Sequence, residues 1–308
     1  MKKFSLALTF LFLGIFINYI YNNPSVFDIF NLLSLDVIFL LLFIKSLTLL
    51  LNGLFNKTLL QAFEAKMNNY DSLYVGSITY LGNLFLPARI GGSLRLIFFN
   101  KKFKIKSSYL VSIFAYFFVI AILINSIFGI ISVLLISSNF DITVILWTLL
   151  NLSFAVTTAY LLVNKFKVRK KTYSSKIIDR ILNFIKDSKD GWNRIGSVKK
   201  LNSNLLTIYS LNYLFFLLEI LIIIYFIGEN FNFLNIVFYN SISVISNLIG
   251  ITPASLGIKE ALTIFSQDLI GLSFDNIIEI LLIERFIAIL FSTIPFVITL
   301  LYDKKQIN

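Results

Sequence analysis

The chain has 308 residues, of which 57% are hydrophobic and 14% are charged, and its formal net charge is +11. Soluble domains contain about 25% charged residues, so this composition excludes an ordinary water-soluble protein. The sequence has no cysteine and no histidine, which excludes disulfides, thiol nucleophiles, imidazole bases and zinc sites built from these residues.

Apolar runs of about 20 residues, the length of a helix that crosses a bilayer core, recur along the sequence. They predict an all-α polytopic membrane protein. The first run begins like a signal peptide, with Lys2 and Lys3, but no small-residue cleavage site follows it, so we interpret it as an uncleaved helix. The six predicted transmembrane helices cover about 4–21, 35–55, 108–136, 142–163, 204–227 and 276–302.

Lysine and arginine are unevenly distributed between the connecting segments. Of the 27 basic residues, 22 lie at the termini or in alternate loops, whereas the loops between them contain only acidic charges. Loops on the cytoplasmic side of a membrane are enriched in Lys and Arg. Both termini are therefore predicted to be cytoplasmic, in a multi-pass protein of the cell membrane. The same distribution explains the positive net charge without a nucleic-acid partner.

Two further apolar regions, 71–99 and 232–270, are interrupted in the middle by Pro and Gly. Two basic loops flank the first region, and two loops without Lys or Arg flank the second. Each region must therefore return to the side of the membrane from which it enters. We predict two re-entrant helical hairpins of opposite orientation, in addition to the six transmembrane helices.

The two interruptions share a short sequence pattern. Residues 87–91 and 253–257 both read P-A-x-x-G, and an asparagine precedes each, at Asn83 and Asn247. Each copy lies in the middle of a unit of helix, hairpin and helix. Inverted repeats with interrupted helices at matching positions are typical of secondary transporters.

This repeat organises the chain as a single domain, 1–308. The first repeat unit covers about 35–136 and the second about 204–302, and a basic linker at 165–200 joins them. The linker contains KIIDRILNFIKDSKDGW, in which apolar and basic residues fall on different faces of a helix. We predict an amphipathic helix on anionic lipid, with Trp192 at the level of the headgroups. The alternative is a solvated connector.

Main-chain N–H groups at a helix start, together with the helix dipole, attract anions such as phosphate. The second arm of each hairpin starts near Gly91 and Gly92 or near Gly257. Arg89 and Arg95 lie beside the first interruption, and a guanidinium can bind a phosphate through two hydrogen bonds. The alternative is that both arginines anchor the segment at the cytoplasmic surface, with Arg95 snorkelling towards water.

The sequences around these two interruptions resemble motifs in the transmembrane domain of lysylphosphatidylglycerol synthases. The same domain also occurs alone in flippase-like proteins. The similarity rests on N-x-x-x-P-x-R-x-G-x-x-x-R in the first hairpin and T-P-x-S-L-G-I-K-E in the second. It implies re-entrant helices, a lipid-facing cavity and movement of lipid between leaflets. The candidate substrate-binding residues are Asn83, Pro87, Arg89, Gly91, Gly92, Arg95, Thr252, Pro253, Gly257, Glu260 and Arg285.

Charged residues inside the apolar segments require partners or a polar cavity, because an ionisable group at mid-helix costs about 2.5–3.5 kcal/mol on insertion scales. Lys45 either lines a cavity or pairs with Glu219 of the equivalent helix in the second unit. Glu260 either accepts a cation, a proton or a headgroup amine, or pairs with Lys259 or Arg285. Lys45, Glu219 and Lys259 are thus candidates for coupling or for structural pairing.

From these observations we expect flippase- or scramblase-like translocation of an anionic phospholipid or a polyprenyl-phosphate-linked lipid. We expect no enzyme activity, no cofactor and no metal; no ATP-binding P-loop motif occurs. The chain ends without the soluble transferase domain of the larger synthases, so aminoacylation is not expected. The alternative is a non-transporting membrane partner or anchor of a lipid- or glycan-modifying enzyme. The sequence leaves homo-oligomer formation open.

Overall fold

The computed structural model of the protein describes residues 33–86, 90–136, 142–165, 176–228, 232–249 and 252–307. Within these ranges every regular element is a helix and no strand occurs. The all-α prediction is therefore confirmed. The first predicted transmembrane helix, at about 4–21, lies outside the described residues.

The helices closely follow the predicted segments, with their ends extended by a few residues. They are α3 (Leu35–Leu60), α4 (Asn69–Phe85), α5 (Ile90–Phe103), α6 (Ser107–Ile136), α7 (Ile142–Val163), α8 (Lys176–Ser197), α9 (Leu201–Ile227), α10 (Phe233–Ile249), α11 (Ile258–Phe265), α12 (Gln267–Ile270) and α13 (Phe274–Ile307), with the short 3₁₀ helices η2 (Gln61–Phe63) and η4 (Pro253–Ser255).

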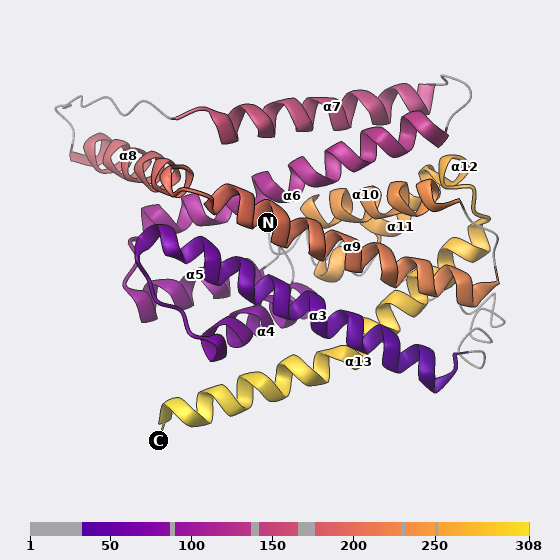
Figure 1. Cartoon of the computed structure of the whole chain (residues 1–308), viewed down its shortest axis with the longest axis horizontal. Helices are drawn as coiled ribbons and strands as arrows, with labels where there is room; N and C mark the ends of the chain where they lie inside the picture. The colour runs from indigo at the N-terminus through magenta and orange to yellow at the C-terminus, as the bar shows by residue number, and fades with distance from the viewer. Residues whose placement is uncertain are drawn as a thin grey trace.

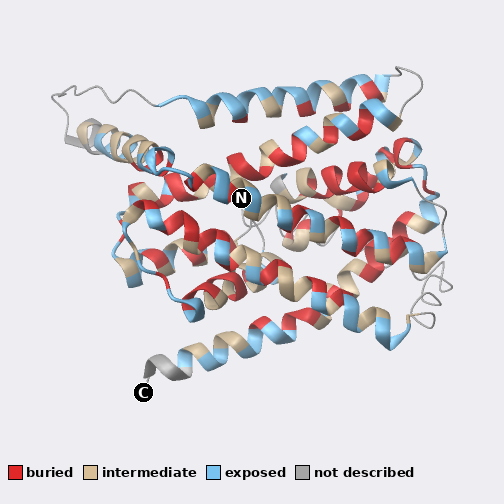
Figure 2. Cartoon of the chain, viewed as in Figure 1, coloured by how far each residue is buried: buried red, intermediate tan, exposed pale blue. Residues whose placement is uncertain are grey.

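Four helices in the described part of the chain are long and apolar enough to cross a membrane: α3 continued by η2, α6, α7 and α9. Figure 2 shows that α7 exposes most of its side chains, whereas α10 is largely buried. Exposed apolar residues along a long helix are stable where lipid, rather than water, surrounds them. The protein is therefore a multi-pass membrane protein.

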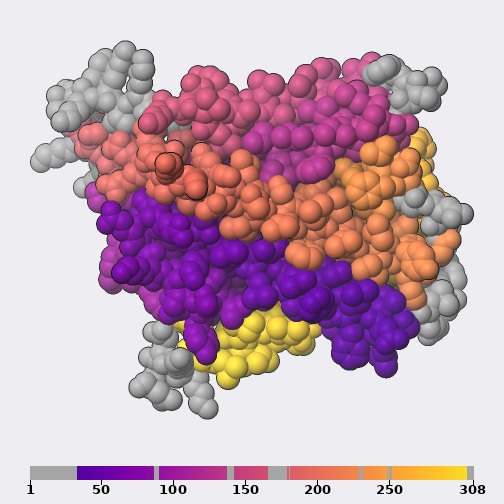
Figure 3. All heavy atoms as spheres, in the orientation of Figure 1, coloured from indigo at the N-terminus to yellow at the C-terminus, as the bar shows by residue number. Residues whose placement is uncertain are grey.

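The long helices pack into one body. Helices α3 and α9 lie side by side across the face seen in Figure 3, while α6 packs against α7, α8 and α10. Helix α13 contacts α3, α4, α9 and α11, so it touches elements from both halves of the chain. Buried aromatic side chains, including Tyr116, Tyr213 and Phe238, fill the core between these helices.

Helices α4 and α5 form a tight hairpin because glycines lie between them. A Cβ atom on Gly91 would lie 2.1 Å from the main-chain oxygen of Thr79, and one on Gly82 would lie 2.5 Å from the Cα of Gly91. Small residues allow backbones to approach closely where no hydrophobic effect drives helices together. Gly91 is thus required by the packing of this hairpin.

The second hairpin is formed by α10 and α11, with η4 in the turn between them. Ala254 and Ser255 have φ of 47° and 55°, and Gly257 has φ of 82°. The Thr252 hydroxyl donates to the Leu256 carbonyl at 2.7 Å, and that of Ser255 donates to Asn247 Oδ1 at 3.1 Å. These bonds hold a left-handed backbone that alanine and serine rarely adopt.

We expect Ala254→Gly to stabilise the protein by up to about 1 kcal/mol. A left-handed backbone costs a residue with a Cβ roughly 1–2 kcal/mol, and the greater freedom of glycine in the unfolded chain offsets part of that gain. Thermal unfolding in detergent, followed by intrinsic fluorescence, measures the change. A loss of stability would show that the Ala254 methyl group makes contacts worth more than the strain.

The two hairpins lie at opposite ends of the molecule. Figure 1 shows α4 and α5 near the end that also carries α8 and the C-terminus, and α10, α11 and α12 near the other end. The turn element η4 nevertheless packs against α4. The interrupted part of the second hairpin therefore meets the first hairpin inside the molecule.

A buried carboxylate ties the first hairpin to α13. Asp71 is only 1% exposed and accepts hydrogen bonds of 2.5 Å from Lys102 Nζ and from the Tyr302 hydroxyl. Partial burial acts to lower the pKa of Lys102, but its hydrogen bonds to Asp71 and Tyr302 outweigh this effect and raise the pKa above the ordinary 10.5. Lys102 therefore remains charged at every physiological pH.

Candidate functional site

A buried ion pair joins the first helices of the two predicted repeat units. Lys45 Nζ on α3 lies 2.6 Å from Glu219 Oε1 on α9, and the Glu219 side chain is 1% exposed. Of the two interpretations of Lys45 from the sequence, the pairing with Glu219 is therefore present. Because this pair is shielded from water, each charge depends on the other for compensation.

Two more ion pairs connect α11 to α13. Lys259 Nζ lies 2.5 Å from Glu284 Oε2, and Arg285 pairs with Glu260, its Nε donating to Glu260 Oε1 at 3.0 Å. Adjacent residues of α13 thus bind adjacent residues of α11. The hydroxyl of Tyr239 on α10 also donates to Glu284 Oε2, at 2.8 Å. The second hairpin is held against α13 by charge as well as by packing.

The three pairs belong to one electrostatic cluster. The charge of Glu284 acts on both Lys45 and Glu219, so the pair between α3 and α9 interacts with the pairs between α11 and α13. Three cations and three carboxylates make the cluster neutral, as its burial requires. Its members come from four helices, α3, α9, α11 and α13, and movement of any of these would separate opposite charges.

The start of α11 binds a carboxylate of the chain itself. The Gly257 N–H donates to Glu260 Oε2 at 2.6 Å, which caps the helix. The sequence predicted that this N–H would be open to an external anion, and in this structure it is not. Glu260 therefore links the turn to Arg285, with one carboxylate oxygen on each.

The start of α5 has no acidic residue in its first turn. Gly91 and Gly92 occupy that turn, and Arg95 follows one turn later. Arg95 is 3% exposed, its Nη1 donates to Asn56 Oδ1 at 3.0 Å, and its guanidinium lies 4.9 Å from the centre of the Phe117 ring. Such an enclosed side chain does not snorkel to water, so this finding argues against the anchoring interpretation.

The structure places the remaining predicted residues as follows. Asn83 lies on the last turn of α4, with its Oδ1 buried against Gly91. Thr252 and Pro253 form the turn of the second hairpin, where Thr252 is buried. Pro87 and Arg89 lie outside the described residues. Three ion pairs therefore bring Glu260, Lys259, Arg285, Lys45 and Glu219 together with Glu284. Arg95 instead donates to Asn56 on α3.

The sequence matches the family described as lysylphosphatidylglycerol synthase TM region over residues 4–295. The chain belongs to this family. The resemblance inferred from the two hairpin motifs is thereby confirmed. A comparison with curated proteins finds no matching relative.

Membership of the lysylphosphatidylglycerol synthase TM region family indicates a lipid-related function in the membrane.

Two residues of the site were not among those predicted from the sequence. Glu284 has a signal, since it is a second carboxylate beside Arg285 in an apolar helix. Tyr239 has none, because an aromatic residue in α10 is indistinguishable from the many that only fill space.

Proposed function

We propose that this protein moves an anionic phospholipid or a polyprenyl-phosphate-linked lipid across the cell membrane, as a carrier and not as an enzyme. In this proposal both termini are cytoplasmic. The α4–α5 hairpin re-enters from the cytoplasmic side, and the hairpin of α10 and α11 re-enters from the external side. The two repeat units around them move in opposite senses.

The observation that carries this proposal is the meeting of the two interrupted hairpins beside a buried, neutral cluster of charges. The turn element η4 packs against α4, and the three ion pairs bind α3 to α9 and α11 to α13. Irregular backbone and ionised side chains are tolerated at membrane depth only where protein or a polar cavity covers them. A protein that only anchors a partner in the membrane would need neither interrupted hairpins nor a buried cluster of charges.

Arg95 is the proposed phosphate-binding residue. It is enclosed by Asn56 and Phe117, so a lipid phosphate reaches it only after the first hairpin separates from α3 and α6. Its guanidinium then exchanges a neutral amide oxygen for a phosphate, which is the stronger acceptor. This exchange couples headgroup binding to the opening of the site. The family match supports a lipid as the bound molecule.

We expect Arg95→Gln to slow lipid transfer at least tenfold, because a hydrogen bond to a charged group contributes about 1.5–3 kcal/mol. The assay uses proteoliposomes containing fluorescent phosphatidylglycerol and measures the rate at which dithionite quenches label that began in the inner leaflet. Lys66→Gln, at an exposed lysine between η2 and α4, is the matched control and should stay within twofold of the parent protein.

Two outcomes would count against the proposal. If the parent protein accelerates transfer of no anionic lipid over protein-free liposomes, the protein is not a translocator under this mechanism. If Arg95→Gln elutes as a folded monodisperse protein and transfers lipid at the parental rate, translocation stands but Arg95 does not bind the phosphate.

A further inference from the structure

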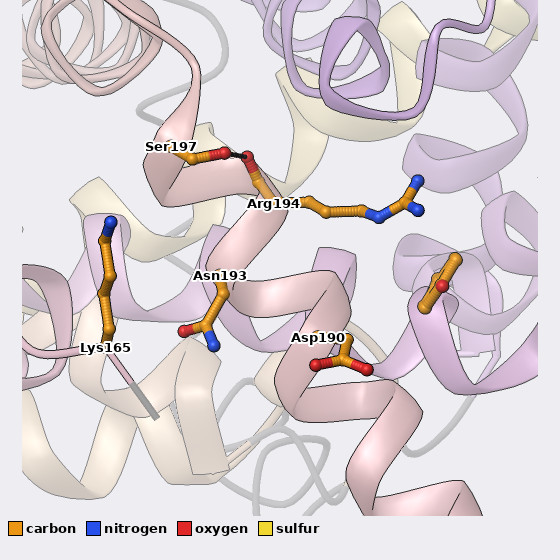
Figure 4. A pocket seen from close by; sticks show the side chains of 6 residues that line it. Lys165, Asp190, Asn193, Arg194 and Ser197 are labelled. Carbon is orange, nitrogen blue, oxygen red and sulfur yellow. Dashed lines mark hydrogen bonds between the residues drawn. The ribbon is translucent and has the colours of Figure 1, made fainter. Parts of the chain in front are cut away.

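A basic cavity of about 350 Å³ lies beside the C-terminal half of α8. Its lining includes two cations, Lys165 and Arg194, and one carboxylate, Asp190. Figure 4 shows the Arg194 side chain pointing away from Lys165, and the Arg194 guanidinium lies 5.4 Å from the centre of the Tyr109 ring. The two cations therefore do not face one point, and a single phosphate would not bind both.

The same half of α8 packs on α6. The Ser112 hydroxyl donates to the Ser188 carbonyl, and a Cβ atom on Gly191 would lie 2.7 Å from Ser112 Oγ. Trp192 is 7% exposed, and its ring lies 4.6 Å from that of Tyr116. The prediction that Trp192 lies among headgroups is therefore wrong, because this half of α8 packs on protein.

Helix α3 carries a stripe of polar residues into the interior of the molecule. Lys45, Thr48, Asn52 and Asn56 follow one another at intervals of three or four residues, so they lie along one face of the helix. Thr48 and Asn56 are 7% and 2% exposed. Polar side chains inside an apolar helix require polar partners or a polar path. We call these four residues the α3 stripe.

The α3 stripe begins at the proposed phosphate-binding residue. Asn56 Oδ1 accepts the hydrogen bond of Arg95 at 3.0 Å. Below it, each side chain of the stripe donates to a carbonyl of the preceding turn: Asn56 to Asn52 at 2.7 Å, Asn52 to Thr48 at 2.9 Å, and Thr48 to Lys45 at 2.8 Å. Lys45 lies eleven residues before Asn56, which is about 16 Å along a helix. The stripe therefore connects Arg95 to the ion-pair cluster.

The α3 stripe faces the seam between α4 and α9. On one side of it, a Cβ atom on Gly53 would lie 2.6 Å from Ser72 Oγ of α4. On the other side, the ring of Phe55 lies 6.3 Å from that of Tyr209 of α9. Because α4 forms one wall of the seam, the proposed movement of the first hairpin away from α3 uncovers the stripe.

Glu219, at the deep end of the stripe, is the least supported carboxylate of the cluster. Its Oε2 accepts no hydrogen bond from the described residues. Glu260 and Glu284, by contrast, each accept hydrogen bonds from two other groups. Hydrogen bonds to a carboxylate stabilise its ionised form. A proton that enters the cluster therefore binds Glu219 most readily.

The titratable groups around Glu219 come from four other helices. Lys45 of α3, Glu284 of α13 and Lys259 of α11 act on its charge, and the Tyr80 hydroxyl of α4 also interacts with it. Helices α6 and α10 pack against α9 as well but contain no Asp, Glu, Lys or Arg. Lys45 is in direct contact, at 2.6 Å, so protonation of Glu219 releases Lys45 first.

We propose that Lys45 is a second phosphate-binding residue, released when a proton binds Glu219, and that the lipid phosphate passes from Arg95 to Lys45 along the α3 stripe. This inference rests on the proposed function and adds a proton to it. Glu219 takes up one proton, Lys45 keeps its charge, and the negative phosphate replaces the carboxylate as its partner. The loaded cluster is then as neutral as the empty one, as burial requires. Proton and lipid therefore cross together without net charge.

The proteoliposome assay tests this coupling when a pH gradient is imposed. Phosphatidylcholine vesicles carry a trace of fluorescent phosphatidylglycerol in both leaflets, and the lumen is made more acidic than the outside. Dithionite then measures the labelled fraction of the outer leaflet. With a gradient of about one pH unit, we expect the label to become at least twofold enriched in the outer leaflet, because a tenfold proton ratio drives it. A membrane potential set with K⁺ and valinomycin at equal pH should not change the distribution.

Glu219→Gln should transfer lipid without any response to the gradient, because an amide does not bind a proton. Lys45→Met/Glu219→Gln leaves no buried charge at this position, so it carries the test if Glu219→Gln does not elute as a folded protein. This double variant should also ignore the gradient, and it should transfer lipid about tenfold more slowly, since one hydrogen bond to a charged group is lost. Glu64→Gln, at an exposed glutamate between η2 and α4, is the matched control and should respond as the parent protein does.

The outcomes separate this inference from the proposed function. A parent protein that transfers lipid but ignores the pH gradient would overturn the inference alone. A gradient response that persists in Glu219→Gln or in the double variant would show that another group binds the proton. Enrichment driven by the membrane potential would contradict a neutral transported unit. If the parent protein transfers no lipid under any condition, both proposals are wrong.

Discussion

Lys45→Met is expected to destabilise the protein by about 3–5 kcal/mol. The substitution keeps an unbranched side chain, one atom shorter, but leaves Glu219, whose side chain is 1% exposed, as a buried charge without its partner. Removal of one member of a buried pair has a cost of this size because the remaining ion has already lost its hydration. Unfolding in detergent with increasing SDS measures the difference in the free energy of unfolding.

The double variant Lys45→Met/Glu219→Leu separates the effect of charge from that of packing. Replacing a buried pair by apolar residues of similar volume is often neutral or stabilising, so the double variant should recover most of the loss. Lys199→Met, at an exposed lysine, is the control for removal of a cation. A double variant as unstable as Lys45→Met alone would mean that packing, and not an uncompensated charge, holds α3 against α9.

Gly91→Ala is expected to destabilise the protein by about 3 kcal/mol and to abolish lipid transfer. The new Cβ would lie 2.1 Å from the Thr79 oxygen and 2.7 Å from Asn83 Oδ1, so α5 must move away from α4. Added methyl groups in a packed interior cost about 1–3 kcal/mol, and a clash with backbone falls at the upper end of this range. Thermal unfolding and the liposome assay measure the two effects.

Gly196→Ala provides a matched control for this substitution. Gly196 also lies in a helix, α8, and nothing lies within 4 Å of the place where its Cβ would be. Alanine is the better helix former by about 1 kcal/mol, so this variant should be as stable as the parent protein or more so. If Gly91→Ala behaved in the same way, the hairpin would be looser than the structure indicates.

The ion-pair cluster sets a physical condition on the proposed movement. Separation of α11 from α13 would part Lys259 from Glu284 and Glu260 from Arg285. An exchange of partners between these two pairs would place Lys259 against Arg285 and Glu260 against Glu284, which are contacts of like charge. The proposed movement therefore needs water or a lipid headgroup to compensate the separated charges.

Sequence alone was sufficient to predict the helical class, most helix positions and the family. Hydrophobic length determines which segments can span a bilayer, and this property is local to each segment. The interruptions near Gly91 and Gly257 could also be predicted from local sequence, because proline and glycine alter the backbone wherever they occur. The possible pairing of Lys45 with Glu219 followed from the cost of an isolated charge in an apolar helix.

Sequence could name possible partners for these charges but could not decide between them. Glu284 and Arg285 are neighbours in the chain, yet the first binds Lys259 and the second binds Glu260, and Tyr239 joins them from α10. Trp192 likewise packs on Tyr116 although the helix that contains it is amphipathic. These outcomes depend on the rotation and spacing of helices that are far apart in the chain.

The sequence by itself determined that two hairpins interrupt a bundle of apolar helices, since chain composition controls where a helix can form and where it must break. Only the tertiary structure decided that these hairpins meet inside the molecule, that Glu260 caps α11 against outside anions, and that a basic cavity lies beside α8. Contacts between distant helices depend on shape and distance, which a linear pattern of residues does not contain.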